Sequence, residues 1–360
     1  MKIKVLKFGG TSVGSIEAIK RSADIIHDWS KKSKVIAVLS AMSGETDRLI
    51  NLTKSFSKNP NPIDFDNAIS SGENVSCALM SICLNNQKIK AKSLLSWQIP
   101  IITSSEHMKS RILSINKKFL YDELENFEVL LIPGFQGINN KGELTTLGRG
   151  GSDTSAVAVA AAMETECIIY TDVEGVFTTD PNIVPKAKKI NKISYEEMLE
   201  LASQGAKVLQ TRSVELAMRK NTKLSVRSSF KPKKIGTMIT DEKSVLENNT
   251  VSGITYSKDE AKITLSRVQD KPGVSSKIFG PLAKGNINVD MILQNISQDG
   301  KFANLSFTLP RLDLEKALKI LKKEKSIIGY KKIISSNNIS KISVVGVGMR
   351  SHAGVALSLI

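Results

Sequence analysis

The sequence predicts an α/β domain with an open, mainly parallel sheet between helices, followed by smaller α+β domains. Over residues 1–230, short apolar strands alternate with segments of helical periodicity. Several of these strands end in small polar or glycine-rich turns, which is typical of parallel sheets that bind ligands at the carboxyl ends of their strands. After residue 250 the order changes to strand, helix, strand, strand, helix, as in a small α+β domain.

The first strand is expected at residues 3–8, and it ends in a glycine-rich turn that precedes a helical pattern from Ile16. A strand, a glycine turn and a helix in this order offer free backbone N–H groups and a helix dipole to an anion. The turn matches neither the Walker A pattern nor the dinucleotide-binding fingerprint. Lys7, at the strand end, would neutralise phosphate charge there, although a lysine beside such a turn is more often an ordinary surface residue.

The next strand, residues 35–39, ends in a hydroxyl-rich turn that begins at Ser40. These hydroxyls would contact a ligand or simply cap the following helix. Residues 51–67 are polar and irregular, with a helix expected over part of them. Glu73 then precedes an apolar helical run over residues 75–84. A carboxylate in that place either gains from the helix dipole or binds an amine.

A glycine-rich stretch, residues 145–156, follows the apolar strand expected at residues 129–133 and a hairpin-like turn. It runs into an alanine-rich helix, so it combines free N–H groups with the positive end of a helix dipole. Arg149 offers a planar fork suited to a carboxylate or a phosphate, and Asp153 would receive an ammonium group or orient a lysine. The alternative is an ordinary loop in which one of residues 152–154 caps the helix.

Four predicted strands end at Lys7, Ser40, Gly134 and Thr171, each in a small polar or glycine turn. In an open α/β sheet the ligand binds outside the carboxyl ends of the strands. We therefore expect these four strand ends to lie together and to form the ligand site.

A capping box at residues 194–197 opens a helix that ends at Gly205, and the next helix is expected to begin at Ala206. Lys207 would then lie near a helix start, where the dipole repels a cation unless an anion is present. This placement favours a role facing phosphate. The last strand of the domain is expected at residues 224–227.

Residues 231–250 are predicted to link a first domain, residues 1–230, to a second region, residues 251–360. In the second region, strands are expected at 261–268, 287–292 and 303–309, and helices at 274–283 and 314–323. Residues 262–274 also resemble residues 341–355, a weak internal repeat whose second copy stops inside its first helix.

The chain has 360 residues, 41% of them hydrophobic and 24% charged, which suits a globular protein of two or three domains. Its net charge of +16 comes mostly from scattered lysines, and aromatic residues make up only 5%, so a nucleic-acid partner is not expected. Neither a membrane span nor a signal peptide is expected. Cys77, Cys83 and Cys167 have no metal-binding or redox spacing, which fits reduced thiols in a cytoplasmic protein.

Together these stretches closely resemble the aspartate kinases, members of the amino-acid kinase superfamily with C-terminal ACT domains. The resemblance rests on residues 7–13, 134–137, 146–156, 171–181 and 194–217 and on the C-terminal region. It implies the amino-acid kinase fold followed by ferredoxin-like ACT domains. It also implies transfer of the γ-phosphoryl group of MgATP to the side-chain carboxylate of L-aspartate, giving 4-phospho-L-aspartate. That reaction begins the synthesis of lysine, threonine and methionine.

The resemblance also assigns roles to residues of the first domain. Those implied in catalysis are Lys7, Asp153 and Lys207. Those implied in aspartate binding are Arg149 at the α-carboxylate and Glu73 at the α-ammonium group, with Thr46 and Ser152 nearby. Those implied in ATP binding are Lys7, Phe8, Gly9, Gly10, Ser40, Thr171, Asp172, Val176, Phe177, Asp180, Pro181 and Lys207. Magnesium would be held mainly by phosphate oxygens and water, because no dense carboxylate cluster is visible in the sequence.

ACT domains of this family bind amino acids and carry feedback inhibition, which implies lysine or threonine as the effector and a homo-oligomer formed through these domains. The effector-contact positions in the first ACT unit, about residues 261–335, are Asp270, Gly273, Val274, Ser275, Asn288, Asp290 and Gln294. A second unit would combine residues 251–257 with 341–360. Family members usually continue for several more strands and a helix, so this unit is incomplete and has open edges. A partner subunit completes it, or the gene product is shortened.

Two other functions remain to be distinguished. A kinase for glutamate or acetylglutamate would share the first domain, but the tandem ACT pattern argues against it. A regulatory subunit that has lost catalysis would share the ACT region, and the intact set Lys7, Glu73, Arg149, Asp153 and Lys207 argues against that. The sequence alone identifies neither the inhibitor nor the oligomeric state.

Overall fold

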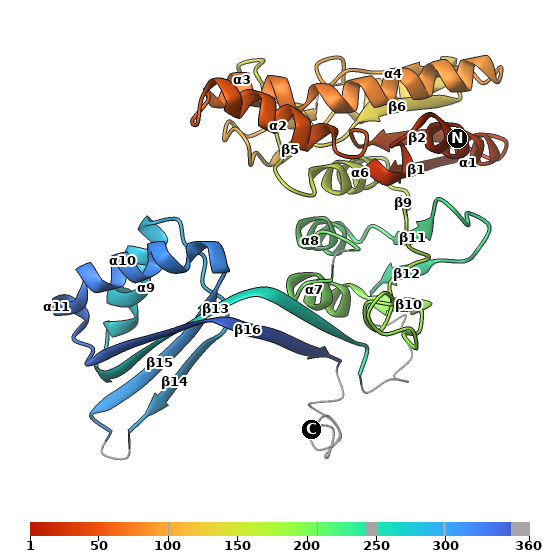
Figure 1. The fold of residues 1–360 in the computed structure, drawn as a ribbon. Helices are drawn as coiled ribbons and strands as arrows, with labels where there is room; N and C mark the ends of the chain where they lie inside the picture. The colour runs from red at the N-terminus through yellow and green to blue at the C-terminus, as the bar shows by residue number, and fades with distance from the viewer. Residues whose placement is uncertain (100, 207, 242–250, 298–299, 347–360) are drawn as a thin grey trace. The chain divides into compact units, whose positions relative to one another are not determined.

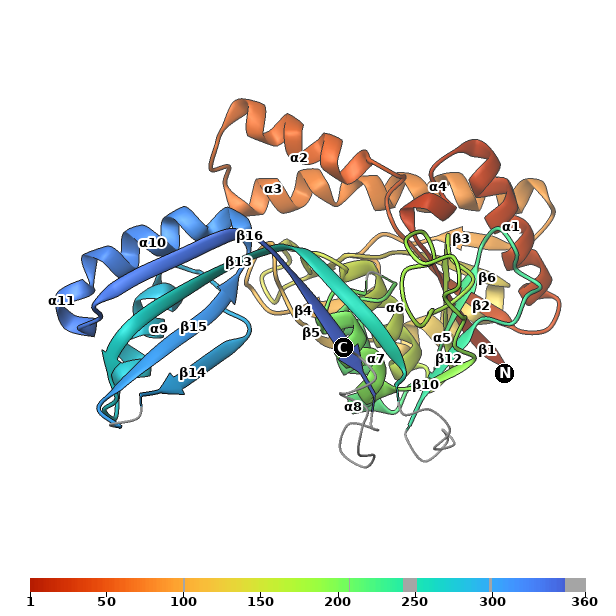
Figure 2. The ribbon, with the colours of Figure 1, turned by 60° about the horizontal axis from the view of Figure 1, so that its bottom comes forward.

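The computed structural model describes residues 1–99, 101–206, 208–241, 251–297 and 300–346. The chain folds as two compact units, which are drawn in Figure 1 and Figure 2. The first unit comprises Met1–Ile254 together with the described residues from Val344 onward, and the second comprises Thr255–Ser343.

The first unit, over its described residues, is built on an eight-stranded sheet of order β10-β12-β11-β9-β1-β2-β6-β3. Neighbouring strands are parallel except for β11 and β12, which are antiparallel. The strands are β1 (Ile3–Phe8), β2 (Lys34–Leu39), β3 (Ala91–Ser93), β6 (Val129–Pro133), β9 (Cys167–Thr171), β10 (Lys192–Ser194), β11 (Leu224–Ser228) and β12 (Thr237–Thr240).

Helices cover both faces of this sheet, which is why its central strands are apolar without alternation. On β2, Val35 and Leu39 pack on the core shared with α1 and α4, whereas Ile36 and Val38 pack on the core shared with α6. Figure 1 shows α4 and α6 on opposite sides of β2. The helices are α1 (Ile16–Ser30), α2 (Glu45–Phe56), α3 (Pro62–Ile69), α4 (Ser71–Asn86), α5 (Lys117–Asn126), α6 (Gly151–Ala162), α7 (Tyr195–Ser203) and α8 (Thr211–Lys220).

A smaller sheet of order β5-β4-β7-β8 lies within the same unit. Its strands are β4 (Ile101–Thr103), β5 (Ile112–Ile115), β7 (Gln136–Ile138) and β8 (Leu144–Thr146). The antiparallel pair β7 and β8 encloses the turn predicted at residues 139–142. Because β8 ends at Thr146, the glycines at 148, 150 and 151 follow this hairpin directly and lead into α6.

The second unit has the strand-helix-strand-strand-helix-strand order of a ferredoxin-like fold. Its sheet order, β14-β15-β13-β16, pairs the first strand with the third and the fourth. The elements are β13 (Gly253–Gln269), α9 (Val274–Lys284), β14 (Ile292–Ile296), β15 (Phe302–Leu309), α10 (Leu314–Lys323), α11 (Lys325–Ile328) and β16 (Lys332–Val345). Both helices α9 and α10 pack on one core with the strands.

Several predicted elements are confirmed. β1 and β6 have the predicted bounds. The capping box is present, because Ser194 Oγ accepts from the backbone N–H of Glu197 and the Glu197 carboxylate accepts from that of Ser194.

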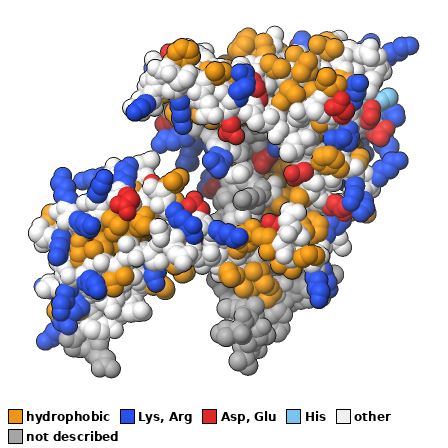
Figure 3. All heavy atoms as spheres, viewed as in Figure 1, with side chains coloured by type: hydrophobic (Ala, Val, Ile, Leu, Met, Phe, Trp, Pro, Cys, Tyr) orange, Lys and Arg blue, Asp and Glu red, His pale blue; other side chains and the backbone are white. Residues whose placement is uncertain are grey.

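Figure 3 shows lysine and arginine side chains spread over the visible face, between apolar and acidic ones. Within the described residues, no helix has the length and apolar character needed to cross a bilayer.

Other elements differ from the prediction. The helix expected from Ala206 begins instead at Thr211. Gly205, at φ +116°, ends α7, and the N–H of Ala206 then donates to the carbonyl of Leu201. Ala206 therefore belongs to the C-terminal end of α7 and cannot start the next helix. The strand expected at residues 287–292 is β14, five positions later. Ile287 is buried but does not pair in a sheet. The alternation of apolar and polar residues from Ile287 onward therefore reflects burial and not a strand.

The helix after the glycine-rich stretch also begins earlier than expected. Gly150, with φ +72°, is its N-cap, so residues 152–154 lie inside the first turn of α6 and do not cap it. Residues 51–67, a polar and irregular segment in which a helix was expected over part, contain the end of α2 and most of α3. The short strands β3 and β5 and the helix α5 were not predicted.

The stretch predicted as a linker, residues 231–250, contains the strand β12. It pairs antiparallel with β11 and parallel with β10, so this part of the chain belongs to the large sheet. Of the second ACT unit, residues 253–257 begin β13 and residues 341–345 end β16. The remainder of that prediction, residues 347–360, lies outside the described residues.

Gly236→Ala tests the place of β12 in the sheet. A Cβ at this position would lie 1.7 Å from the carbonyl oxygen of Val226 in β11, so the hairpin would have to open. We expect a loss of about 1–3 kcal/mol in the free energy of unfolding, measured as a fall in Tm. Gly280→Ala on α9, where a Cβ meets nothing within 4 Å, is the control and should keep or slightly raise Tm. An unchanged Tm in Gly236→Ala would contradict the assignment.

Candidate active site

The carboxyl ends of β9, β1, β2 and β6 lie side by side, because these four strands are consecutive and parallel in the sheet. Backbone hydrogen bonds join them just beyond the strands. The N–H of Gly9 donates to Tyr170 O (3.3 Å), that of Ser40 to Phe8 O (3.1 Å) and that of Gly134 to Leu39 O (2.9 Å). The expectation that these four strand ends are neighbours is confirmed.

A buried ion pair lies at this edge. Lys7, at the end of β1, places its Nζ 2.6 Å from Oδ1 of Asp153 in the first turn of α6. The two residues are 9% and 7% exposed. A Cβ on Gly9 would lie 3.5 Å from the same Nζ, so the glycine backbone passes beside the ammonium group. Desolvating two charges together is costly, which favours a role for the pair beyond stability.

The turns around this pair pack so closely that side chains would collide. A Cβ on Gly134, after β6, would lie 2.8 Å from Cβ of Ser152 on α6. A Cβ on Gly72, in the first turn of α4, would lie 2.8 Å from Cβ of Ala41 in the turn after β2. These contacts fix the first turns of α4 and α6 against the strand ends, and with them Glu73 and Asp153.

Glu73 is buried in the first turn of α4, with 3% of its surface exposed. Burial raises the pKa of its carboxyl group to about 8, although hydrogen bonds from the backbone of Glu73 itself and of Ala41 act in the opposite direction. Its Oε2 atom accepts no hydrogen bond from any residue that the structure describes. An acceptor left unpaired in a buried place is suited to an ammonium group brought by a ligand.

Arg149 is exposed, and it makes no ion pair or hydrogen bond with the described residues. Gly148 and Gly150 flank it at φ +77° and +72°. The backbone before it is fixed, because Leu147 N–H donates to Phe135 O (2.8 Å). Among the residues that the structure describes, none pairs with this guanidinium group, and the backbone two residues before it is held in place.

Two further residues predicted to bind aspartate lie near these turns. Ser152 packs on Gly134, as described, and Thr46 is half-buried in the first turn of α2. Lys207, predicted to act in catalysis, lies outside the described residues.

The predicted nucleotide segment begins where β9 ends. Thr171 Oγ1 donates to Asp172 Oδ1 (3.0 Å), and Thr171 O accepts from the N–H of Ser229 (2.8 Å). Asp180 Oδ1 accepts from the N–H of Asn182, which shapes the turn that contains Pro181.

Not every residue of the predicted nucleotide set can offer its side chain to a ligand. Phe8 is fully buried and stacks on Tyr170 with 5.0 Å between ring centroids. Val176 is 1% exposed and lies in the hydrophobic core. Phe177 is half-buried and pairs through its backbone with Lys189. At the positions of Phe8 and Val176 only the backbone remains for a nucleotide.

The predicted effector residues lie in the second unit, and the structure joins only some of them. Gln294 Nε2 donates to Asp270 Oδ1 (3.0 Å), whereas Asp290 forms an ion pair with Lys341, which was not predicted. Although burial opposes its charge, Asp290 and Glu260 hold the pKa of Lys341 above its ordinary value. The others lie at and after the N-terminus of α9 and before β14, and they are Gly273, Val274, Ser275 and Asn288.

Two thiols of this unit are fully buried, Cys77 on α4 and Cys167 at the start of β9. Burial, together with the charge of Glu73, raises the pKa of Cys77 well above its ordinary value. Burial and the charge of Asp153 do the same for Cys167. No group of three or more His, Cys, Asp or Glu placed to hold a metal ion occurs in the part of the chain that the structure describes.

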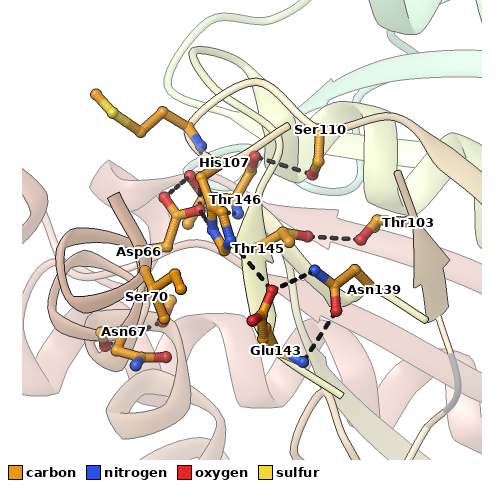
Figure 4. Close-up of polar contacts among 12 residues, drawn as sticks. Asp66, Asn67, Ser70, Thr103, His107, Ser110, Asn139, Glu143, Thr145 and Thr146 are labelled. Carbon is orange, nitrogen blue, oxygen red and sulfur yellow. Dashed lines mark hydrogen bonds and ion pairs between the residues drawn. The ribbon is translucent and has the colours of Figure 1, made fainter. Parts of the chain in front are cut away.

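One residue of importance was missed. Asp66, in α3, is fully buried and joins three segments through its carboxylate (Figure 4). Its position next to Phe65 and three residues before Ile69, both buried, is the sequence signal for an inward-facing carboxylate.

Solved structures share this architecture. E. coli aspartokinase III in complex with aspartate and ADP (R-state) matches with a TM-score of 0.79 at 24% identity, over 99% of this chain and 90% of that one. E. coli aspartokinase III in complex with lysine and aspartate (T-state) matches with a TM-score of 0.75 at 25% identity, over 96% of this chain and 87% of that one. The predicted fold class is confirmed.

Sequence comparison gives the family. The profile of the amino acid kinase family matches residues 2–228, and that of the ACT domain matches residues 263–326. The aspartate kinase of Pseudomonas putida strain KT2440 is 48% identical over 359 residues, which cover 99% of this chain and 87% of that protein. The chain belongs to the amino acid kinase family, and within it to the aspartate kinases with an ACT domain.

The buried carboxyl group of Glu73 predicts a pH-dependent stability. Below its ordinary pKa of 4.5 the group is protonated in both the folded and the unfolded state. As pH rises from 4.5 to about 8 the unfolded state ionises first, so the folded state loses stability. Glu73→Gln, neutral throughout, should avoid this loss. We expect its Tm advantage to grow from near zero at pH 4.5 to about 2–6 °C at pH 9.

Differential scanning fluorimetry across this pH range measures the effect. Glu125→Gln, at an exposed position on α5, is the matched control and should follow the unaltered protein. A Tm difference that does not change with pH would show that Glu73 is not held neutral by burial.

Proposed function

We propose that the chain transfers the γ-phosphoryl group of ATP to the β-carboxylate of L-aspartate, giving 4-phospho-L-aspartate for lysine, threonine and methionine synthesis. The observation that carries this proposal is the buried Lys7–Asp153 pair at the edge where four parallel strands end. A cation and a glycine turn at such an edge are suited to the phosphates of a nucleotide. The relatives named aspartate kinase support the same substrate.

The chemistry requires positioning more than proton transfer. The acceptor carboxylate is already ionised at pH 7, so no general base is needed. Lys7 neutralises charge on the transferred group, with the glycine turn of Gly9 and Gly10 beside it, and Asp153 orients the ammonium group of Lys7. The N–H of Gly9 already donates to Tyr170 O, so Gly9 contributes close backbone approach rather than a free donor. Magnesium, held by phosphate oxygens and water, supplies further charge neutralisation when the nucleotide is bound. Lys207 is proposed to act with Lys7 on the phosphates.

Aspartate is recognised at both its α-groups. Glu73 receives the α-ammonium group, which supplies the missing hydrogen bond to its Oε2 and favours the ionised carboxylate. Arg149, without a protein partner among the described residues, takes the α-carboxylate by a bidentate contact. Thr46 and Ser152 line the same turns.

The ACT unit is proposed to bind an amino-acid effector, lysine or threonine, and to inhibit the kinase. The related E. coli aspartokinase III in complex with lysine and aspartate supports lysine as a candidate. The joined pair Asp270 and Gln294 and the N-terminus of α9 form the proposed contact surface. A homo-oligomer through the ACT units belongs to the same proposal.

The activity is tested by trapping the acyl phosphate. Purified protein with MgATP and L-aspartate should form a hydroxamate when hydroxylamine is present, and it should form far less with L-glutamate or N-acetylglutamate. Formation of ADP without hydroxamate would be ordinary ATP hydrolysis. Absence of hydroxamate from properly folded protein would overturn the proposal.

Arg149→Lys tests the substrate-binding end of the site. The substitution keeps the charge but loses the planar fork, so we expect the KM for aspartate to rise about tenfold or more. The KM for ATP should change less than about twofold. Steady-state kinetics with each substrate varied in turn measures both.

The control is Arg48→Lys on α2. Arg48 forms an ion pair with Glu45 at the surface, so this substitution should leave the KM for aspartate and the KM for ATP unchanged. Equal increases in the two KM values for Arg149→Lys would count against its assignment to aspartate.

A further inference from the structure

Asp66 accepts hydrogen bonds from two distant segments while it is itself fully buried. Its Oδ2 accepts from the backbone N–H groups of Met108 (3.0 Å) and Thr146 (3.0 Å) and lies 2.9 Å from His107 Nδ1. Its Oδ1 accepts from Thr146 Oγ1 at 2.6 Å. Figure 4 shows the carboxylate between the histidine and the threonine. A buried carboxylate with all these partners is stabilised, whereas loss of the partners would leave it very unfavourable.

The histidine of this group extends the network to the β7–β8 hairpin. His107 Nε2 lies 3.6 Å from Glu143 Oε2, and the same Glu143 oxygen accepts from Asn139 Nδ2 at 2.7 Å (Figure 4). Asn139 and Glu143 stand on either side of the hairpin turn. Asp66 therefore joins α3, residues 107–108 and the hairpin into one polar cluster.

The chain beyond Thr146 is held by the same cluster and its surroundings. Thr146 O accepts from Ser110 N–H (2.9 Å) and Ser110 Oγ (3.0 Å). Arg212 of α8 then donates to Leu147 O (2.8 Å) and to Ser110 O (2.7 Å). The backbone is thus fixed on both sides up to Leu147, two residues before Arg149.

The other side of Asp66 leads to Glu73. Helix α3 ends at Ile69, and Ser70 is both its C-cap and the N-cap of α4. The N–H of Ser70 donates to Asp66 O (3.1 Å), and Ser70 O accepts from Gln136 Nε2 (2.9 Å). Glu73 lies in the first turn of α4, so the helix junction that carries it is continuous with the residue that holds Thr146.

We propose that Asp66 is a positioning residue that sets the separation between the Glu73 carboxylate and the Arg149 guanidinium. This inference rests on the proposed function, in which those two groups hold the α-ammonium and α-carboxylate of aspartate. These two α-groups are joined through one carbon atom, so the protein groups must keep a fixed separation. A displacement of about 1 Å at such a site lowers the rate on the order of 100-fold.

Asp66→Ala removes all the acceptors and tests the role. We expect the KM for aspartate to rise about tenfold or more, while the KM for ATP stays within about twofold, because the Lys7 end of the site does not depend on Asp66. Asp66→Asn retains a carbonyl acceptor for the backbone N–H groups and should recover most of the aspartate affinity. Asp64→Ala, exposed on the same helix, is the matched control and should change neither constant.

A milder pair of variants serves if Asp66→Ala does not fold. Thr146→Val has the shape of threonine but no hydroxyl, so it removes the 2.6 Å contact to Asp66 Oδ1. We expect a selective rise in the KM for aspartate in this variant. Thr146→Ser keeps the hydroxyl and should behave like the unaltered protein.

A double-mutant cycle separates positioning from general structural damage. If Asp66 acts through Arg149, Thr146→Val and Arg149→Lys together should raise the aspartate KM less than the product of their single effects. Multiplicative effects, equal increases in both KM values, or no selective effect of Asp66→Ala and Thr146→Val would overturn the positioning role. The proposed function would survive those results if Arg149→Lys alone still acted selectively. If Arg149→Lys did not act selectively, the assignment of Arg149 to aspartate would fail, and this inference with it. The kinase activity itself is tested separately by the hydroxamate assay.

Discussion

The first unit is organised around two opposite charges buried together at the end of its central strand. Lys7 of β1 and Asp153 of α6 lie 2.6 Å apart, and each is held there by turns that pack within van der Waals distance. Removing either charge would leave the other unpaired, at a cost of about 3–5 kcal/mol. The same pair that fixes α6 on the sheet therefore also fixes the electrostatics of the edge.

The fold class and the neighbourhood of the four strand ends were predictable because their signals are local. An apolar run that ends in a glycine or hydroxyl turn marks a strand end, and the geometry of parallel sheets then places four such ends together. Where the signal was weak or ambiguous, prediction failed. The strand β3 has only three residues, too few to show a pattern. A buried apolar residue such as Ile287 looks the same in the sequence whether it lies in a strand or in a loop that packs on the core. The N-terminus of α8 was misplaced because the end of α7 takes up Ala206.

Candidate site residues were predictable where a residue type stands in or beside a recognisable turn or helix start, as Lys7, Arg149 and Glu73 do. Asp66 offered little warning, because its partner Thr146 is 80 residues away and an exposed Asp64 stands on the same short helix. Lys341 was missed for the same reason, since its partner Asp290 lies 51 residues away. Burial of a charge is a property of tertiary structure. The sequence gives the position of each charged residue, but only the tertiary structure shows which residues it contacts.

The placement of the three thiols has a practical consequence for the chemistry of the protein outside its own reaction. Cys77 and Cys167 are buried near Glu73 and Asp153 with raised pKa values, so neither readily forms the thiolate that electrophiles and oxidants attack. Burial and the charge of Asp24 also raise the pKa of Cys83 on α4, but this thiol is only half-buried, so a reagent reaches it first. The protein therefore carries one partly exposed thiol as an attachment point for a fluorophore or cross-linker, beside two buried thiols that react slowly.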